Sequence, residues 1–340
     1  MSFEAFKKVH LELSSECQAA CPACSRVYDY SRHIKNRKED SAWNLKALRK
    51  VFSKELLSEL DELFLCGNYG DPLAFNDLSL WFEEIYSINP RLFTMIHTNG
   101  GLGKASTWGH LGKTLKYFGH EIKFSLDGLE DTNSLYRRGV NWNQALNNAK
   151  LFIENGGKAT WKFLEFTHNK HQIEKARKLA NDLGFCHFEV RKPYGDHDGL
   201  IHLPKGSDLN PNLQTDFSKL SEKELNQELF KSHDQTKEIN CQAIEEKMIY
   251  IDCDQRVWPC CWLAQDGDHR TRTIKREHFY RKVYEAGIPQ DFNHLNTNSL
   301  EEILFHPFFQ EMLPSSWKKE SLISLSYFPT CFETCGKCSS

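Results

Sequence analysis

Apolar strand-like segments alternate with amphipathic helical segments through residues 9–190 of this 340-residue chain. This alternation constrains the fold most strongly, because strands that alternate with helices form parallel β-α-β units. The predicted strands are 9–13, 63–66, 92–96, 121–126, 161–166 and 185–190. Apolar residues at helical spacing predict helices at 45–56, 78–85, 105–118, 145–152 and 173–183. Six such units predict an open doubly wound sheet or an incomplete barrel.

Polar loops follow the predicted strands at the points where those strands end. Residues 67–72 follow the second strand, 97–101 the third and 127–128 the fourth, and each loop contains glycine. The carboxyl ends of parallel strands share one edge of a sheet or barrel, and ligand sites are built at that edge in both architectures. We therefore expect functional side chains at this edge.

The charge balance and the amino terminus argue against several classes of protein. A net charge of −3 does not favour a general binder of nucleic acid or of membrane surfaces. Residues 1–8 lack the apolar core of a signal peptide, and no apolar run reaches the length of a membrane span. The sequence therefore predicts a cytoplasmic protein with no nucleic-acid or membrane partner, whose thiols stay reduced.

Ten of the twelve cysteines fall into two clusters near the ends of the chain. The clusters are Cys17, Cys21 and Cys24, and then Cys241, Cys253, Cys260, Cys261, Cys331, Cys335 and Cys338. Cys66 and Cys186 are isolated, as is typical of small buried apolar residues. Two clusters in a reducing compartment indicate two metal sites rather than a disulfide framework.

The first cluster contains three thiols, one fewer than the four ligands of a closed metal site. Cys17, Cys21 and Cys24 lie within eight residues just after the first predicted strand, so they can converge on one point. Structural zinc takes four ligands, and so does an iron–sulfur cluster held entirely by protein. A cubane cluster held by three cysteines would leave one iron open for another ligand.

The spacing C-x3-C-x2-C resembles the signature of the radical S-adenosylmethionine (SAM) family, in which the open iron takes the amino and carboxylate groups of SAM. The segment Tyr-Gly-Asp-Pro at 69–72 resembles the family's GGEP-like turn, whose backbone carbonyls and acid hold the methionine ammonium. The resemblance implies cofactor contacts from Tyr69, Gly70, Asp71 and Pro72. Here Asp71 replaces the usual glutamate and Tyr69 a glycine.

Three later segments resemble further motifs of the family, and the likeness extends over residues 8–190. They are a TNG motif at 98–100, an SLDG motif at 125–128 and an Arg-Gly segment at 136–139. The resemblance implies cofactor contacts from Thr98, Asn99, Ser125, Asp127 and Arg138. The guanidinium of Arg138 can pair with a carboxylate. Ala23 departs from the family, since many members carry an aromatic residue there.

The resemblance also implies how the domains are organised. Residues 1–195 are expected to form a partial (β/α)6 TIM-like barrel of parallel strands. Residues 196–240 are polar and rich in turn signals, which predicts a linker or lid with one helix near 221–230. Residues 241–340 resemble the twitch domain, the shorter relative of the SPASM extension. We expect this part to be a small α+β cysteine-rich domain with a β-hairpin at 248–258.

In twitch domains the cysteines hold an auxiliary [4Fe–4S] cluster. The resemblance implies ligation by Cys241, Cys260, Cys335 and Cys338, with Cys331 and Cys261 as alternates. Gln255 stands where the family usually has glycine in the hairpin turn. Seven thiols cannot fully ligate two four-cysteine clusters, so one auxiliary cluster is expected. A zinc site with four cysteine ligands is the alternative.

Family membership implies that SAM is cleaved reductively to methionine and a 5′-deoxyadenosyl radical, which abstracts a hydrogen atom from the substrate. The auxiliary cluster then favours oxidation of a small molecule, such as an alcohol or sugar, or of a peptide side chain. Such a step also needs a proton acceptor. Candidates near the strand ends are Glu165, His168, Tyr194, His197 and Asp198.

Two other functions stay open at this point. The first is a peptide-modifying maturase that forms a crosslink or an epimer. Only eight residues precede the first strand, so a fused leader-peptide domain is not expected there and a separate peptide-recognition protein would be needed. The second is a non-catalytic iron–sulfur electron-transfer or metal-binding protein. A catalytic member would take its electron from a reductant such as flavodoxin or ferredoxin.

Overall fold

A computed structural model of the chain describes residues 3–22, 24, 26, 43–193, 221–230, 237–266, 274–323 and 326–338. The described residues form two compact units. We call the unit that contains the described residues of 11–193 the sheet unit, and the unit that contains 3–10 and those of 221–338 the cysteine unit. No helix within the described residues is both long enough and apolar enough to cross a membrane.

The central sheet confirms the predicted fold class. Its strands are β1 (Lys8–Leu11), β2 (Glu62–Leu65), β3 (Phe93–Thr98), β4 (His120–Ser125), β5 (Ala159–Leu164), β6 (His187–Arg191), β8 (Met248–Ile251) and β9 (Val257–Trp258). The strand order is β6-β5-β4-β3-β2-β1-β8-β9, and β2 to β6 pair in parallel. The described strands do not close into a ring, so the structure is a partial barrel.

Helices connect the strands of the sheet unit. They are α2 (Leu45–Val51), α3 (Lys54–Glu59), α4 (Leu78–Ile88), α5 (Ala105–Leu115), α6 (Asn133–Tyr136), α7 (Trp142–Glu154) and α8 (Ile173–Asp182), with the 3-10 turns η4 (Pro72–Ala74) and η5 (Lys170–Gln172). The single helix predicted at 45–56 is wrong, because the chain breaks between α2 and α3. Ser53 caps the second of these, accepting a hydrogen bond from Leu56 N at 3.3 Å.

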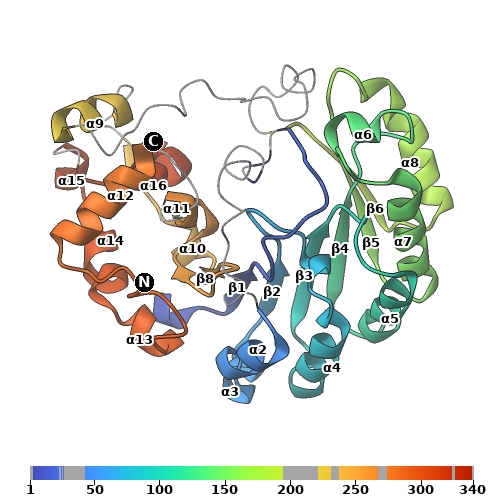
Figure 1. The fold of residues 1–340 in the computed structure, drawn as a ribbon, viewed down its shortest axis with the longest axis horizontal. Coiled ribbons are helices and arrows are strands. Elements are labelled where there is room, and N and C mark those ends of the chain that lie inside the picture. The colour runs from blue at the N-terminus through green and yellow to red at the C-terminus, as the bar shows by residue number, and fades with distance from the viewer. Residues whose placement is uncertain are drawn as a thin grey trace. The chain divides into compact units, whose positions relative to one another are not determined.

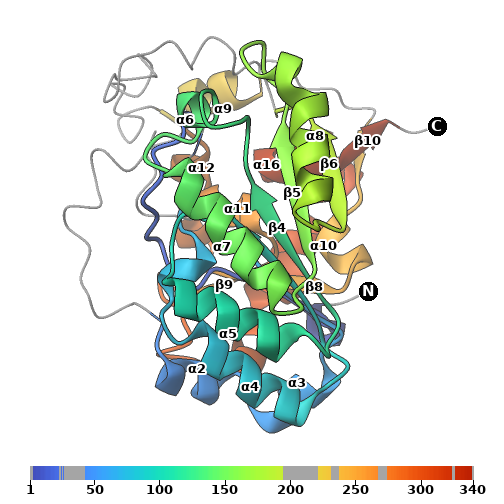
Figure 2. The same ribbon diagram turned by 90° about the vertical axis from the view of Figure 1, so that its right-hand side faces the viewer.

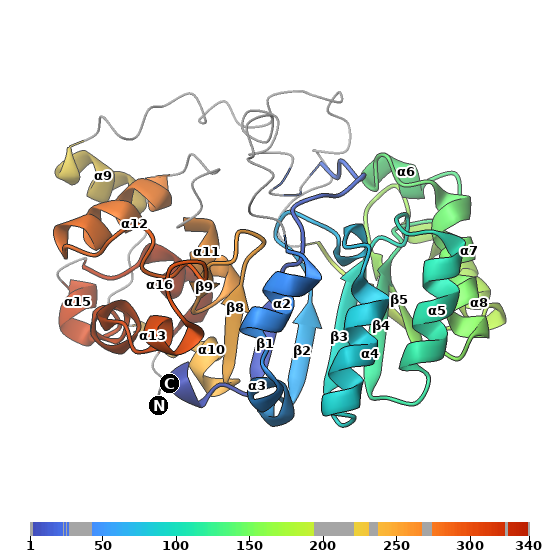
Figure 3. The ribbon, with the colours of Figure 1, turned by 60° about the horizontal axis from the view of Figure 1, so that its bottom comes forward.

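Helices α5, α7 and α8 cover one face of the central strands (Figures 1 and 2). Trp108 and Trp161 are fully buried, and the Trp108 ring packs at 5.1 Å from the Phe124 ring of β4. Each large apolar side chain buried in this layer stabilises the fold by about 1.5–3 kcal/mol. The arrowheads of β2 and β3 point the same way in Figure 3, so their carboxyl ends meet at one edge.

The cysteine unit is mostly helical. Its elements are η1 (Phe3–Ala5), α9 (Glu222–Leu229), β7 (Lys237–Ile239), α10 (Gln242–Glu245), α11 (Cys261–Asp266), α12 (Ile274–Glu285), α13 (Leu300–Leu304), the π-helix η9 (Phe308–Met312), α14 (Leu313–Ser315), α15 (Lys319–Ile323), α16 (Pro329–Cys335) and β10 (Gly336–Cys338). The predicted hairpin is confirmed as antiparallel β8 and β9. Gln255 in its turn adopts φ 62°, the left-handed conformation that glycine adopts most easily.

The pairing of β7 with β10 was not predicted. These three-residue strands run antiparallel, with Ile239 opposite Gly336 and Lys237 opposite Cys338. Neither segment alternates clearly in hydrophobicity, so the sequence alone carried no strand signal. The pairing holds the chain before Cys241 next to the chain after Cys335, and it therefore joins cysteines that are far apart in sequence.

Candidate functional site

The first cysteine cluster lies in the loop after β1, within the sheet unit. Cys21 is buried, and Cys17 and Cys24 are half-buried. The loop turns tightly, since Cys24 N donates a hydrogen bond to Cys21 O at 3.0 Å. Two side chains from other segments donate N–H groups to these thiols. Asn99 Nδ2, just after β3, donates to Cys17 Sγ at 3.4 Å, and Arg137 Nη1, at the end of α6, donates to Cys21 Sγ at 3.8 Å.

Burial governs the acidity of these thiols. It raises the pKa of Cys17 to about 12 and that of Cys24 to about 11, and it also raises the pKa of Cys21. A bound metal centre would displace the thiol protons, because metals bind the thiolate form. The N–H donors beside Cys17 and Cys21 suit thiolate sulfur, since sulfur accepts hydrogen bonds more strongly when it carries negative charge.

Asp71 joins the turn after β2 to the end of β3. Its buried carboxylate accepts hydrogen bonds from Asn99 N at 2.9 Å, Asn99 Nδ2 at 2.8 Å and Thr98 Oγ1 at 2.9 Å. Leu73 N also donates to it, at 3.0 Å. Burial raises the pKa of the Asp71 carboxyl although these donors oppose the shift. The Asp71 carboxylate is therefore occupied by these hydrogen bonds, which orient Thr98 and Asn99.

The turn at 69–72 is held from beneath by Glu12, which sequence reasoning missed. Glu12 Oε1 accepts hydrogen bonds from Tyr69 N at 2.7 Å and from Gly70 N at 3.0 Å. A Cβ atom on Gly70 would lie 1.7 Å from the Ser14 carbonyl oxygen, so only glycine fits there. A buried acid between Leu11 and Leu13 was the available signal, because a buried carboxylate needs polar partners.

Asp127 and Arg137 form a buried ion pair below the cysteine loop. Arg137 Nε lies 2.6 Å from Asp127 Oδ2, and the Asp127 side chain is fully buried. Leu164 N donates to the other carboxylate oxygen at 2.7 Å. The predicted cofactor residue was the neighbouring Arg138, whose backbone carbonyl accepts a hydrogen bond from Ala20 N at 2.7 Å. Sequence reasoning did not single out Arg137, because the motif holds two adjacent arginines; the cofactor contact of Arg138 stays a prediction.

The remaining predicted residues of the sheet unit lie at or near the strand ends. Ser125 is half-buried at the end of β4, and Pro72 is buried at the start of η4. Glu165 and His168 follow β5 and are half-buried, with the His168 ring stacked on Phe166 at 5.3 Å. Tyr194, His197 and Asp198 lie outside the described residues. Cys186 is exposed, so the prediction that it is a buried apolar residue is wrong.

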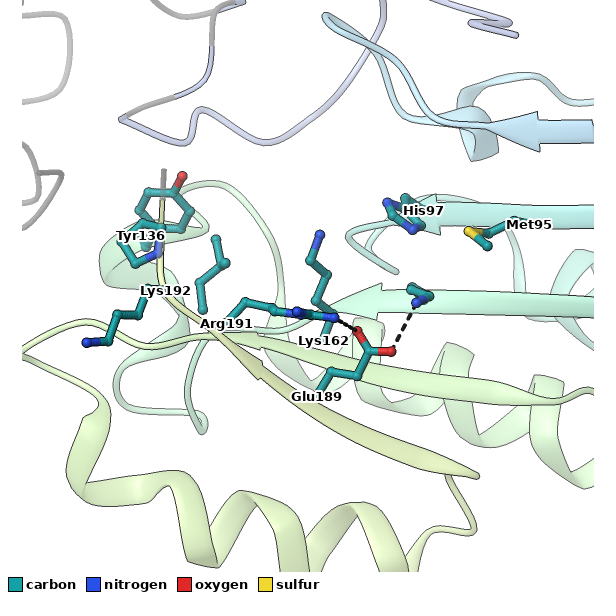
Figure 4. A pocket seen from close by; sticks show the side chains of 10 residues that line it. Met95, His97, Tyr136, Lys162, Glu189, Arg191 and Lys192 are labelled. Atoms are coloured by element: carbon teal, nitrogen blue, oxygen red, sulfur yellow. Dashed lines mark hydrogen bonds and ion pairs between the residues drawn. The ribbon is translucent and has the colours of Figure 1, made fainter. Parts of the chain in front are cut away.

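A cavity of about 600 Å³ lies against the strands of the sheet unit. Side chains of β3 to β6 line it, together with Tyr136 and the two residues after β6 (Figure 4). Its polar lining residues include His97, Lys123, Lys162, Glu189 and Arg191. Neither Glu165 nor His168 lines it. The volume is within the usual range for small-molecule sites.

In the cysteine unit, thiols of the second cluster are linked by electrostatic interactions that centre on Cys241 and Cys260. Cys241 interacts with Cys335 and Cys260, and Cys331 interacts with both Cys260 and Cys241. Burial raises the pKa of Cys241 to about 11 and also raises the pKa values of Cys260 and Cys331. Leu263 N donates to Cys260 Sγ at 3.4 Å. These contacts make a thiol-rich, partly desolvated site.

Two other predicted auxiliary residues are Cys338 and Cys261. The side chain of Cys338 lies outside the described part of the structure, and Cys261 is half-buried at the start of α11, where it interacts electrostatically with Cys260. Among the described side chains, no group of three or more His, Cys, Asp or Glu residues is arranged to hold a metal ion. A four-iron cluster binds each thiolate through a different iron atom, so its cysteines stand farther apart than the ligands of a single ion.

No protein-family model and no curated protein matches this sequence. The structure is similar to that of SuiB from Streptococcus suis bound to S-adenosylmethionine, with 18% identity and a TM-score of 0.53 over 80% of this chain. The chain spans 64% of SuiB, less than two thirds of its length. SuiB bound to the precursor peptide SuiA matches at 18% identity and a TM-score of 0.52, over 79% of this chain and 62% of that one.

A second similar structure covers more of the chain. Histidine-tagged anSMEcpe with bound AdoMet matches at 16% identity and a TM-score of 0.53, over 92% of this chain and 81% of that chain. These likenesses agree with the open parallel sheet and with the helices that cover it. The chain therefore has the partial-barrel fold of the radical SAM enzymes.

Proposed function

We propose that the chain is a radical SAM enzyme whose cluster is held by Cys17, Cys21 and Cys24. The observation that carries the proposal is the convergence on these thiols of two side chains from other segments, one at the end of β3 and one at the end of α6. Asn99, after β3, donates to Cys17 at 3.4 Å, and Arg137, after β4, donates to Cys21 at 3.8 Å. When bound, a [4Fe–4S] cluster and SAM supply reductive cleavage of the sulfonium and a 5′-deoxyadenosyl radical that abstracts a substrate hydrogen.

The thiols and the residues around them support this assignment, because they provide metal ligands and hydrogen-bond donors to those ligands. The cysteines supply three ligands, which leaves room for a non-protein ligand. Asp71 keeps Asn99 directed at Cys17, and Asp127 keeps Arg137 directed at Cys21. The residues proposed as cofactor contacts lie at the carboxyl ends of β2, β3 and β4 or in the loops that follow them, except Arg138, which follows α6; the others are Tyr69, Gly70, Asp71, Pro72, Thr98, Asn99, Ser125 and Asp127. In this proposal Asp71 acts by orienting Asn99.

An auxiliary [4Fe–4S] cluster in the cysteine unit is the second part of the proposal. Cys241, Cys260 and Cys335 are three of its ligands, and the fourth is Cys331 or Cys338. The electrostatic coupling of Cys331 with Cys241 and Cys260 supports Cys331. The other thiol, Cys338, lies on β10, directly opposite Lys237 of β7.

The reaction that we propose is oxidation of a small molecule or of a peptide side chain. When bound, the auxiliary cluster would supply the acceptor for the electron that remains after hydrogen abstraction, and a side chain such as Glu165 or His168 would take the proton. The cavity of about 600 Å³ has the size of a small-molecule site and supports this proposal. The alternative is a peptide-modifying maturase. Structures of SuiB with precursor peptide SuiA and of anSMEcpe with a Cp18Cys peptide favour that alternative by likeness of fold.

The test is anaerobic reconstitution with iron and sulfide, followed by SAM and dithionite. We expect 5′-deoxyadenosine and methionine from the wild-type chain, and neither product from Cys17→Ala. The matched control is Cys186→Ala, which removes an exposed, isolated thiol and should leave product formation unchanged. Failure of the wild-type chain to form 5′-deoxyadenosine, at full iron content, would contradict the proposal and favour a non-catalytic iron–sulfur protein.

A further inference from the structure

One face of the central strands carries charged side chains where a parallel sheet is usually apolar. Parallel sheets are generally buried on both faces, so their strands read as continuous apolar runs. In β4 and β5, alternate residues instead point their charged or polar side chains away from the helices, with Lys123 following Ile122 and Lys162 following Trp161. Because side chains alternate along a strand, this charged face was readable from the sequence.

The strand register brings these residues into one row across the sheet. Lys123 of β4 is the Cα partner of His97 in β3, and Lys162 of β5 is the partner of Glu189 in β6. Lys123 Nζ lies 3.0 Å from Glu189 Oε1 and 3.5 Å from Glu121 Oε1. Glu189 also pairs with Arg191 at 3.8 Å, as the dashed line in Figure 4 shows.

Lys162 differs from the other cations of the row. Its side chain is half-buried, and its ammonium makes no hydrogen bond or ion pair with any residue that the structure describes. Burial lowers the pKa of Lys162, and the positive charges of Arg137 and Lys123 lower it further, while Cys66 and Asp127 oppose the shift. A half-buried ammonium with no anion in direct contact is costly, so Lys162 is suited to contact an anion that enters the cavity.

The charges around the cavity are unbalanced. Four cations line it, Lys123, Lys162, Arg191 and Lys192, against the single carboxylate of Glu189, which leaves +3. Counting Glu121, which pairs with Lys123 from outside the lining, still leaves +2. Lys123 and Arg191 are paired through Glu189, so the positive charge available to a ligand is mainly that of Lys162 and the exposed Lys192.

We propose that the cavity binds the oxyanion of an acidic substrate, a carboxylate or a phosphate, with Lys162 as its principal contact. The proposal rests on the proposed radical SAM function and deepens it, because it names the charge of the substrate. Figure 4 shows Lys162, Glu189 and Arg191 extending into the same space, with Tyr136 and Lys192 farther along it. A volume of about 600 Å³ suits a small acid or one acidic side chain of a peptide.

The test measures anion binding to the reconstituted holoenzyme at saturating SAM and constant ionic strength. Inorganic phosphate and glutarate serve as probes in isothermal titration calorimetry. We expect the wild-type chain to bind at least one of them, and Lys162→Met to weaken that binding at least about tenfold. Lys162→Arg should retain it. The matched control, Lys178→Met, removes an exposed lysine that pairs with Asp182 on α8 and should bind as the wild type does.

Four outcomes decide the matter. If the wild type binds neither probe, or if Lys162→Met binds as tightly as the wild type, the inference is wrong. If Lys162→Met instead loses SAM affinity while anion binding is unchanged, the partner of Lys162 is the SAM carboxylate, and the inference is also wrong.

Formation of 5′-deoxyadenosine by the same preparation tests the proposed function separately. Anion binding without that product would contradict the function and leave the anion site standing. Thermal unfolding of Lys162→Met checks that this variant folds. Retained anion binding in Lys162→Arg separately shows that the positive charge at this position is what binds the anion.

Discussion

The carboxylate of Asp71 accepts hydrogen bonds from both nitrogen atoms of Asn99, at 2.9 Å from the backbone and 2.8 Å from the side chain. Asn99 in turn places its Nδ2 at 3.4 Å from Cys17 Sγ. A residue that follows β2 therefore orients the donor beside a thiol that follows β1. The first prediction concerns this relationship.

Asp71→Asn should destabilise the sheet unit by about 1–3 kcal/mol, because an amide cannot accept every hydrogen bond that the carboxylate accepts. Iron content and SAM affinity should fall with it. Urea unfolding, iron analysis and SAM titration measure the three effects. Asp77→Asn is the control, because the Asp77 side chain makes no capping hydrogen bond at the start of α4. Wild-type stability and iron content in Asp71→Asn would rule this role out.

Gly70→Ala should disrupt the site more than a typical glycine substitution. The added Cβ would lie 1.7 Å from the Ser14 carbonyl oxygen, so the turn or the cysteine loop must move. We expect a loss of at least about 2 kcal/mol of stability and reduced cluster content. Gly109→Ala on α5 is the control, since its Cβ meets nothing closer than 3.5 Å and alanine favours helix by up to about 1 kcal/mol. Equal stability of the two variants would contradict the close approach.

Arg137→Gln should cost about 3–5 kcal/mol, because it leaves the buried Asp127 carboxylate without its cation. It also removes the N–H donor to Cys21, so we expect the midpoint potential of the cluster to change. Denaturant unfolding and anaerobic redox titration measure these effects. Arg177→Gln breaks the exposed pair with Glu174 and a cation–π contact with Phe188, so it should cost at most about 1 kcal/mol and leave the midpoint potential unchanged. A redox potential unchanged in Arg137→Gln would argue against a contact with the cluster ligand.

The fourth ligand of the auxiliary cluster can be identified by iron counting. Two [4Fe–4S] clusters correspond to about eight irons per chain. If Cys331 is the ligand, Cys331→Ala should lose about half of the iron while Cys338→Ala keeps it, and the reverse pattern would identify Cys338. Cys186→Ala is again the control. About four irons and one zinc in the wild type would support the zinc alternative instead.

Protonation of His278 should make the cysteine unit less stable in acid. Burial lowers the pKa of His278 from 6.5 to about 4, and its ring meets Tyr327 O at 3.2 Å. The unfolded chain therefore binds a proton first, and stability falls as the pH drops below about 6.5. We expect about 2 kcal/mol to be lost by about pH 5.

His278→Asn should remove most of this slope, because asparagine does not titrate. His110→Asn is the control, since the His110 side chain is 47% exposed in its pair with Glu83. Unfolding free energies of the three proteins between about pH 5 and pH 7.5 make the comparison. A slope that persists in His278→Asn would assign the effect to another group.

Much of the sheet unit could be predicted from the sequence, because its signals are local. The alternation of apolar strands and helices predicted the existence of β1 to β6 and their parallel units. The loops with glycine after β2, β3 and β4 predicted the edge where the site lies. Helix ends were less predictable. The apolar pattern continues across the break between α2 and α3, and the break depends on Ser53, which caps the start of α3.

The sequence by itself determined the parallel architecture, the three-cysteine loop and the polar glycine turn at 69–72. Only the tertiary structure decided which side chains meet there. It selected Arg137 over Arg138 as the partner of Asp127, placed Glu12 beneath the turn, and left Lys162 without a partner among the described residues. The physical reason is that periodicity reports which face a residue occupies. Ion pairs and hydrogen bonds depend instead on the distances between elements, which arise only when the chain packs.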